Sequence, residues 1–437
     1  MRGLRSTIIL IIVLGALVGY IYYLNRDGAT DEDAKEKAFA SVNAEDIEEV
    51  QIRSADGETS RAQKADGAWR LVEPVQAAAD ENELTSITSS LASLDMQRVV
   101  DENAPDLKEY GLEPARLEVS FRTKADKEPK RILLGERTPT GGDLYARFPD
   151  QKRVFLVSSF LDATFNKNTF ALREKSIIKI DREKIDRVEV VAGARTVTLA
   201  KNGNDWRIVE PQALRADFAA VEGALERLSS AQMQAIVSPD GGDLKGYQLD
   251  PPVASFSAVS GSARATLLLG ETENALIYAK DSSRPMVFTV APTLYTDLIR
   301  DVSDFRRKDL FDSRSFTTTR IELRRGADTV VLEKTNIGDK REVWKNGAGK
   351  DIEAMKVEDL LTKVSALRAE SFAAAANPAL KTPALTVIVR FDDSKTEQVT
   401  FGRAGTDIVA SRSDEPGTAA VDATSFEDTI KALDALK

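Results

Sequence analysis

The chain has 437 residues, a formal net charge of −10, 30% charged residues and 42% hydrophobic residues, and it contains neither cysteine nor histidine. Its length exceeds what one compact core holds, and its composition is ordinary for globular domains. The net charge argues against a nucleic-acid partner, because such binding needs a concentrated positive surface. The two missing residue types exclude disulfides, thiolate zinc sites, Ser-His-Asp and Cys-His catalysis and nearly every transition-metal site. Neither a metal nor a cofactor is predicted.

An apolar stretch near the N-terminus predicts a single transmembrane helix over residues 7–24. Its core, Ile8 to Leu24, carries no charge and reaches about 26 Å as a helix, which is enough to cross a hydrocarbon core. Arg2 and Arg5 precede this stretch, and acidic residues soon follow it. The positive-inside rule therefore places residues 1–6 in the cytoplasm and the bulk of the chain on the other side of the membrane.

A cleaved signal peptide is the alternative interpretation of the same stretch. Three tyrosines close the apolar run where a small-residue cleavage site is expected, which favours a retained signal anchor. Gly15 and Gly19 form a small-xxx-small pair, a pattern that lets two such helices approach closely as a homodimer.

A phrase built around tryptophan occurs three times and divides the rest of the chain. The sequence Trp-Arg-Leu-Val-Glu-Pro at Trp69 returns as Trp-Arg-Ile-Val-Glu-Pro at Trp206, and a diverged copy surrounds Trp344. The spacings, 206 − 69 = 137 and 344 − 206 = 138 residues, are each long enough for a domain. The predicted organisation is therefore a tether at 25–44, repeats at 45–180 and 181–318, and a degenerate repeat at 319–437.

The first half of each repeat is predicted to contain three strands and a helix. Alternating apolar residues indicate the first strand, a Gly-containing turn leads into the second, and the tryptophan phrase forms the third, which its proline ends. Asp80 and Asp217 stand at the N-cap of a helix with one apolar stripe, and Glu353 lies near the same position in the third repeat.

The second half of each repeat is predicted to be a β-meander with a closing helix. It begins with a Tyr-x-Leu-x-Pro turn at Tyr110 and Tyr247, and the meander contains a Leu-Leu-Gly-Glu phrase. The glycines of that phrase and its remnant, Gly135, Gly270 and Gly402, are interpreted as turn residues after a buried strand. The predicted fold class is α+β, three tandem repeats with mostly antiparallel sheets behind the transmembrane helix.

No group of residues matches an active-site motif, so no catalytic residue is predicted. The recurring positions form a binding or structural signature: Trp69, Glu73, Pro74, Tyr110, Trp206, Glu210, Pro211, Tyr247 and Trp344. The tryptophans are interpreted as core residues whose indole N–H finds a backbone acceptor, with a platform for sugar or lipid as the alternative. Glu73 and Glu210 lie near an indole and are weighed as general acids, although the third repeat has Lys345 and Asn346 just after its tryptophan.

These phrases together resemble the bacterial family known as domain of unknown function 4340. The resemblance covers Ala44 to Asp312 and, more weakly, the rest of the chain. It implies a single-pass protein of the bacterial inner membrane, with its bulk in the periplasm and often encoded beside an ABC transporter of the gliding-motility type. The family supplies no catalytic residues.

We therefore expect a non-enzymatic accessory or scaffold protein of an ABC-type transport or envelope machine, with the transporter permease or related envelope proteins as partners. One alternative is a periplasmic module that binds lipid or glycan in a groove between repeats. A second is a carboxylate-dependent hydrolase of envelope glycan, which requires two facing carboxylates about 5 to 9.5 Å apart in one cleft.

Overall fold

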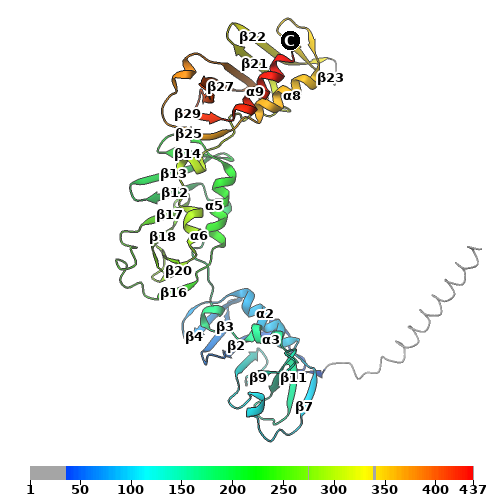
Figure 1. Ribbon diagram of the computed structural model, residues 1–437. Coiled ribbons are helices and arrows are strands. Elements are labelled where there is room, and N and C mark those ends of the chain that lie inside the picture. Colours follow the sequence, from blue (N-terminus) through cyan, green and yellow to red (C-terminus); the bar gives the residue numbers. More distant parts are fainter. Residues whose placement is uncertain (1–35, 274, 338–340, 437) are drawn as a thin grey trace, which may run out of the picture. The chain divides into compact units, whose positions relative to one another are not determined.

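The computed structural model of the chain describes residues 36–273, 275–337 and 341–436, which form two compact units joined between Lys175 and Ser176 (Figure 1). The predicted cytoplasmic tail, transmembrane helix and Gly15–Gly19 contact lie outside the described residues. Within those residues, every helix is too short or too polar to cross a membrane.

The first unit is built on a nine-stranded antiparallel sheet with the order β5-β4-β3-β2-β8-β9-β10-β11-β7. Its strands are β2 (Ile47–Arg53), β3 (Thr59–Ala65), β4 (Ala68–Glu73), β5 (Ala77–Ala78), β7 (Arg98–Asp101), β8 (Leu117–Thr123), β9 (Lys130–Arg137), β10 (Asp143–Arg147) and β11 (Val154–Ser158). A separate two-stranded ribbon joins β1 (Glu36–Lys37) to β6 (Asp95–Met96). The first three strands thus meet the later meander where β2 pairs with β8.

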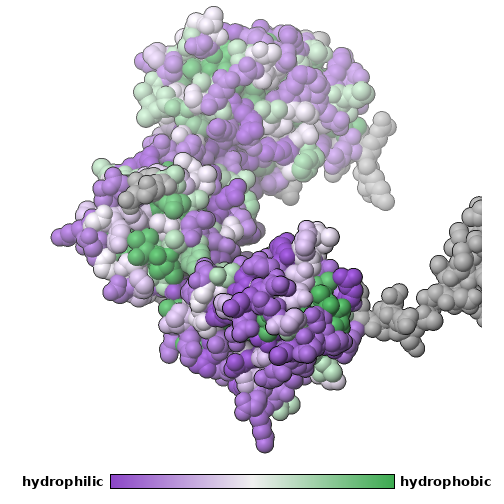
Figure 2. Space-filling model, turned by 60° about the horizontal axis from the view of Figure 1, so that its bottom comes forward, coloured by the Kyte–Doolittle hydropathy of each residue, from purple (hydrophilic) through white to green (hydrophobic). Residues whose placement is uncertain are grey.

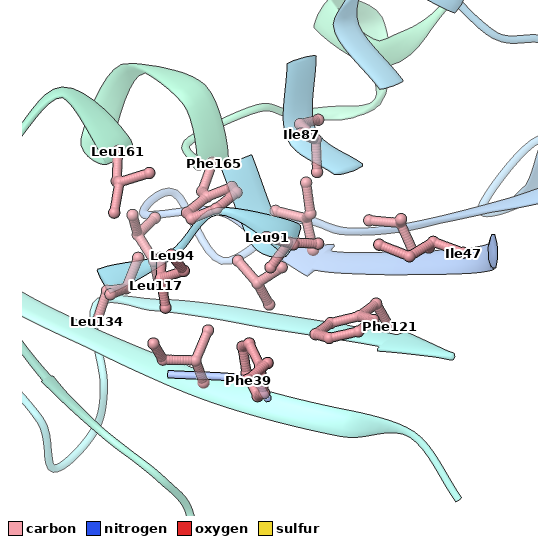
Figure 3. Close-up of a cluster of buried hydrophobic side chains, with 14 of the residues drawn as sticks. Phe39, Ile47, Ile87, Leu91, Leu94, Leu117, Phe121, Leu134, Leu161 and Phe165 are labelled. Atoms are coloured by element: carbon pink, nitrogen blue, oxygen red, sulfur yellow. The ribbon is translucent and has the colours of Figure 1, made fainter. Parts of the chain in front are cut away.

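One face of this sheet is covered by α2 (Glu81–Ala92), α3 (Phe160–Phe165) and α4 (Thr169–Leu172). Figure 3 shows Ile87 and Leu91 of α2 and Phe165 of α3 above Leu117 and Phe121 of β8. The apolar stripe predicted for α2 therefore faces the sheet, and its removal from water stabilises the unit.

The predicted N-caps of the long helices are confirmed. The Asp80 carboxylate accepts hydrogen bonds from the backbone N–H groups of Asn82 and Glu83, and Asp217 accepts one from Ala220. Glu353 occupies the N-cap position in the third repeat. The Asp80 and Asp217 carboxylates satisfy amide groups that have no partner within the helix, whereas the Glu353 side chain makes no capping hydrogen bond.

The second unit contains two more nine-stranded antiparallel sheets, with the orders β15-β14-β13-β12-β17-β18-β19-β20-β16 and β24-β23-β22-β21-β26-β27-β28-β29-β25. The first comprises β12 (Arg187–Ala192), β13 (Arg195–Asn202), β14 (Asp205–Glu210), β15 (Leu214–Arg215), β16 (Ala235–Ser238), β17 (Ala254–Ser260), β18 (Ala263–Glu273), β19 (Leu276–Asp281) and β20 (Val287–Val290). Its helices are α5 (Phe218–Ser230), α6 (Pro292–Leu298) and α7 (Val302–Phe305).

The last sheet comprises β21 (Thr318–Arg325), β22 (Asp328–Ile337), β23 (Arg341–Asn346), β24 (Asp351–Ile352), β25 (Ala369–Ala373), β26 (Leu385–Phe391), β27 (Lys395–Ala404), β28 (Asp407–Arg412) and β29 (Thr418–Val421), covered by α8 (Ala354–Ser365) and α9 (Ala423–Asp434). Short 3-10 helices lie at Ala44–Asp46, Lys108–Tyr110, Arg182–Lys184, Pro378–Lys381 and Asp392–Ser394. All three sheets have the same strand order. The third repeat therefore keeps the whole topology although its sequence phrases have diverged.

Each repeat begins with a short incoming segment that enters its core before the first strand of the sheet. Backbone N–H groups in these segments donate to carbonyls just after the long helix, from Ala38 to Leu94, Ile177 to Ala231 and Leu310 to Leu367. The next residue along the chain, Phe39, Ile178 or Phe311, is buried. The predicted repeat boundaries at 45, 181 and 319 leave these segments outside the repeats whose cores they fill.

Candidate functional site

The three tryptophans lie in buried positions on the third strand of their repeats. Trp69 is in β4, Trp206 in β14 and Trp344 in β23. The indole N–H of Trp206 donates to the Glu222 carboxylate at 2.9 Å, where a backbone acceptor was expected. Burial at the same place in all three repeats agrees with the interpretation of these residues as core packing.

A lysine opposite each tryptophan was missed by sequence reasoning. The strand registers pair Lys64 with Trp69, Lys201 with Trp206 and Lys334 with Trp344. The ammonium groups of Lys201 and Lys334 lie 5.1 and 5.6 Å from the centres of the indole rings, a cation–π geometry. The spacing to tryptophan is 69 − 64 = 5 and 206 − 201 = 5 residues but 344 − 334 = 10, because the third hairpin is longer. A lysine five residues before the tryptophan is therefore a sequence pattern of the first two repeats only.

The glutamate and proline of the tryptophan phrase lie at the surface end of that strand. Glu73 accepts a hydrogen bond from the guanidinium of Arg61, and Glu210 accepts one from the Thr198 hydroxyl at 2.7 Å. The bonds preceding Pro74 and Pro211 are cis, and β4 and β14 end just before these prolines, as predicted. Both glutamates thus contact the neighbouring strand.

The signature tyrosines pack on the sheet face opposite to the helices. Tyr110 meets Tyr145 with ring centres 4.9 Å apart, and Tyr247 meets Tyr278 at 4.8 Å. Tyr145 alternates along β10 with residues of the helix-side core, so it projects to the other face. The structure therefore does not bring the signature tryptophans and tyrosines of a repeat together in one site.

The glycines of the meander are not turn residues, and that interpretation is wrong. Gly135, Gly270 and Gly402 lie within β9, β18 and β27. A Cβ atom at these positions would collide with the carbonyl oxygens of Tyr110, Tyr247 and Ala379 in the turn that crosses the strand. Glycine is therefore required by a close backbone approach.

The Gly135→Ala substitution is expected to lower the free energy of unfolding of the first unit by about 1–3 kcal/mol, because the turn must move to admit a methyl group. Peptide-resolved hydrogen exchange of the full-length protein measures the change. Gly142→Ala is the matched control, since no atom lies within 4 Å of its added Cβ. Equal effects of the two substitutions would contradict the close-approach explanation.

The junction of the second and third repeats, inside the second unit, contains a buried charge cluster. Arg215 and Arg306 each donate to the Glu415 carboxylate at 2.9 Å, and the backbone N–H of Arg215 donates to it at 2.7 Å. The Glu415 side chain is only 3% exposed. Arg306 also lies over the ring of Phe372 on edge strand β25, 3.9 Å from its centre. Because these groups are buried, removal of one charged partner would leave the other as an uncompensated buried charge, which is strongly destabilising.

A second buried pair holds the incoming segment of the third repeat. Arg412 donates to Glu397 at 2.9 Å and to the carbonyl of Leu310 at 2.6 Å, and Glu397 also accepts the backbone N–H groups of Asp312 and Ser313. Burial opposes the charge on Arg412, but hydrogen bonds to Asp414 and Glu397 outweigh it and raise the pKa of this guanidinium. The hydrogen bond that Arg412 donates to Asp414 in turn lowers the pKa of the Asp414 carboxyl.

A cavity of about 530 Å³ lies beside this cluster. Its lining comes from β14, the start of α5, the incoming segment of the third repeat and the turn between β26 and β27. Several of its charged residues pair with one another, Arg307 with Asp312 at 2.8 Å and Lys395 with Asp392 at 3.3 Å. Two lining side chains, Asp205 and Arg207, have no hydrogen bond or ion pair to any described residue.

The described residues contain no group of three or more carboxylates placed to hold a metal ion. On the face shown in Figure 2, hydrophilic residues predominate and hydrophobic residues gather in small groups. The lining of the cavity is itself rich in charged side chains.

Comparison with known proteins identifies one family. The model described as "Domain of unknown function (DUF4340)" matches residues 69–207 and 206–386, so each match runs from one tryptophan past the next. No curated protein matches the chain. Among solved structures, the DNA polymerase III subunit beta of Pseudomonas aeruginosa is 11% identical over 86% of this chain and 92% of its own, with a TM-score of 0.17. Transferrin binding protein B of Haemophilus parasuis is 10% identical over 83% and 64%, with a TM-score of 0.07. These TM-scores are too low to support an inference.

Proposed function

This chain belongs to the family of the domain of unknown function DUF4340, and we propose that its repeats position a binding surface while its membrane anchor contacts a partner. The protein is a non-enzymatic accessory or scaffold of an ABC-type transport or envelope machine. Residues 7–24 anchor it in the bacterial inner membrane, with the N-terminus in the cytoplasm and the repeats in the periplasm. The anchor contacts the permease, and the repeats hold a binding surface away from the membrane.

The observation that carries this proposal is that the signature residues pack within the fold of each repeat. The tryptophans fill the helix-side cores and the tyrosines pack on the opposite sheet faces. Residues that recur in this way meet the requirements of a fold, which favours a structural role over a shared reaction centre.

The buried charges at the junction of the second and third repeats add to this support. Glu415 joins two arginines of the preceding repeat, and breaking such a buried pair is costly. A junction of this kind keeps two neighbouring repeats in a fixed relation, which suits a protein whose work is to position other molecules.

Crosslinking in cells followed by detergent purification of the tagged full-length protein tests the proposal. We expect permease or other transporter subunits to be recovered with it. The matched control replaces residues 7–24 by an unrelated transmembrane helix and should lose the permease while keeping the protein in the membrane. Recovery of this chain alone after crosslinking, or equal recovery with the replaced anchor, would count against the proposal.

A further inference from the structure

We propose that the 530 Å³ cavity at the junction of the second and third repeats binds a short neutral oligosaccharide. The volume lies within the range of about 300–1,000 Å³ that is usual for small-ligand sites. This inference goes beyond the accessory function and does not depend on it, since it rests on the cavity alone.

The charges around the cavity favour a neutral ligand with many hydroxyl groups. Four cationic side chains line it, Arg207, Arg215, Arg307 and Lys395, against five acidic ones, Asp205, Asp217, Asp309, Asp312 and Asp392. This near balance offers no excess of positive charge to an anion. The polar lining also leaves little apolar wall for the acyl chain of a lipid, which would have to desolvate charged groups on entering.

Two of these side chains remain free to bind a ligand. Asp205 and Arg207 lie two residues apart on β14 and therefore project from the same face of the strand. One supplies only acceptors and the other only donors, and neither is engaged by another described residue. A sugar hydroxyl both donates and accepts, so adjacent hydroxyls satisfy the two groups at once.

Phe218 supplies the apolar surface of the site. It lines the cavity at the first residue of α5, and 55% of it is exposed. The first helix residue is Glu81 in the first repeat and Ala354 in the third, so the fold does not require an aromatic ring at this position. An exposed ring beside hydrogen-bonding groups suits the C–H face of a pyranose, which stacks on aromatic surfaces while its hydroxyls point to the polar side chains.

Saturation-transfer difference NMR on the full-length protein in detergent tests the site with three probes, maltotriose, cellotriose and triacetylchitotriose. We expect transfer to at least one trisaccharide, and at least tenfold weaker binding after Arg207→Ala or Phe218→Ala. Phe218→Tyr should retain binding, because it keeps the ring. Arg70→Ala changes the corresponding exposed arginine of the first repeat and should leave the affinity unchanged.

Absence of transfer to all three trisaccharides at millimolar concentration would overturn this inference. Binding that Arg207→Ala and Phe218→Ala leave intact, or that Arg70→Ala weakens equally, would overturn it as well. Hydrogen exchange of the second unit confirms that each variant is folded. A negative result here is distinguishable from failure of the accessory function, which is measured by recovery of transporter subunits.

Discussion

Replacement of Glu415 by glutamine is expected to lower the free energy of unfolding of the second unit by about 3–5 kcal/mol, because it removes one partner of a buried ion-pair cluster. Arg215 and Arg306 would keep their charges without the carboxylate that now accepts from both of them. The amide also replaces one acceptor oxygen by a donor, which faces a guanidinium. The site cannot recover these interactions with water, since the Glu415 side chain is 3% exposed.

Urea unfolding of the full-length protein, followed by hydrogen exchange on peptides of each unit, measures this effect. Glu427→Gln on α9 is the matched control, since Glu427 forms an ion pair with Arg403 in which both side chains are well exposed. Such surface pairs contribute about 0–1 kcal/mol. A loss below 1 kcal/mol for Glu415→Gln would show that the cluster does not stabilise the junction.

Phe311→Ala is expected to lower the free energy of unfolding of the third repeat by about 3–5 kcal/mol, because it opens a cavity in the core. Phe311 belongs to the incoming segment, is 0% exposed and packs among the buried residues of the third core, with its ring 6.5 Å from that of Phe401. The connection between the second and third repeats is thus a structural part of the third repeat.

Phe316→Ala provides the control within the same connection, because Phe316 is 79% exposed. It should change the stability by less than about 0.5 kcal/mol. Hydrogen exchange on peptides from β21 to β29 distinguishes the variants, and peptides of the first unit serve as an internal reference. Equal effects of the two substitutions would contradict the assignment of Phe311 to the third core.

The three repeats hold their incoming segments with different chemistry at one position of the fold. Phe148 follows β10 and packs against Phe39, with ring centres 5.6 Å apart. In the second repeat Asp281, at the end of β19, pairs with Arg284, which donates to the carbonyls of Ser176 and Ile177. Arg412, at the end of β28, binds the carbonyl of Leu310. Phe148 and Arg412 contact the incoming segment directly, whereas Asp281 acts through Arg284, so the residue type at this position varies from aromatic to acidic to basic.

This variation explains why sequence comparison missed the incoming segments and the junction. Phrase matching detects residues whose type recurs, such as Trp69 and Trp206. It does not detect a position at which the contact is kept while the side chain changes. The junction also joins distant residues, since Arg215 and Glu415 are 200 positions apart. No local pattern in the chain indicates that pair.

The amino-acid sequence by itself determined the threefold repetition, the α+β class, the strand ended by Pro74 and the aspartate caps. These features depend on residues within a few positions of one another, where periodicity and backbone preference act directly. Only the tertiary structure decided that Gly135 lies inside a strand beneath a crossing turn, that a lysine pairs across the hairpin with each tryptophan, and that Glu415 joins two repeats. Those contacts come from strand pairing and packing between segments far apart in the chain, which local propensity does not encode.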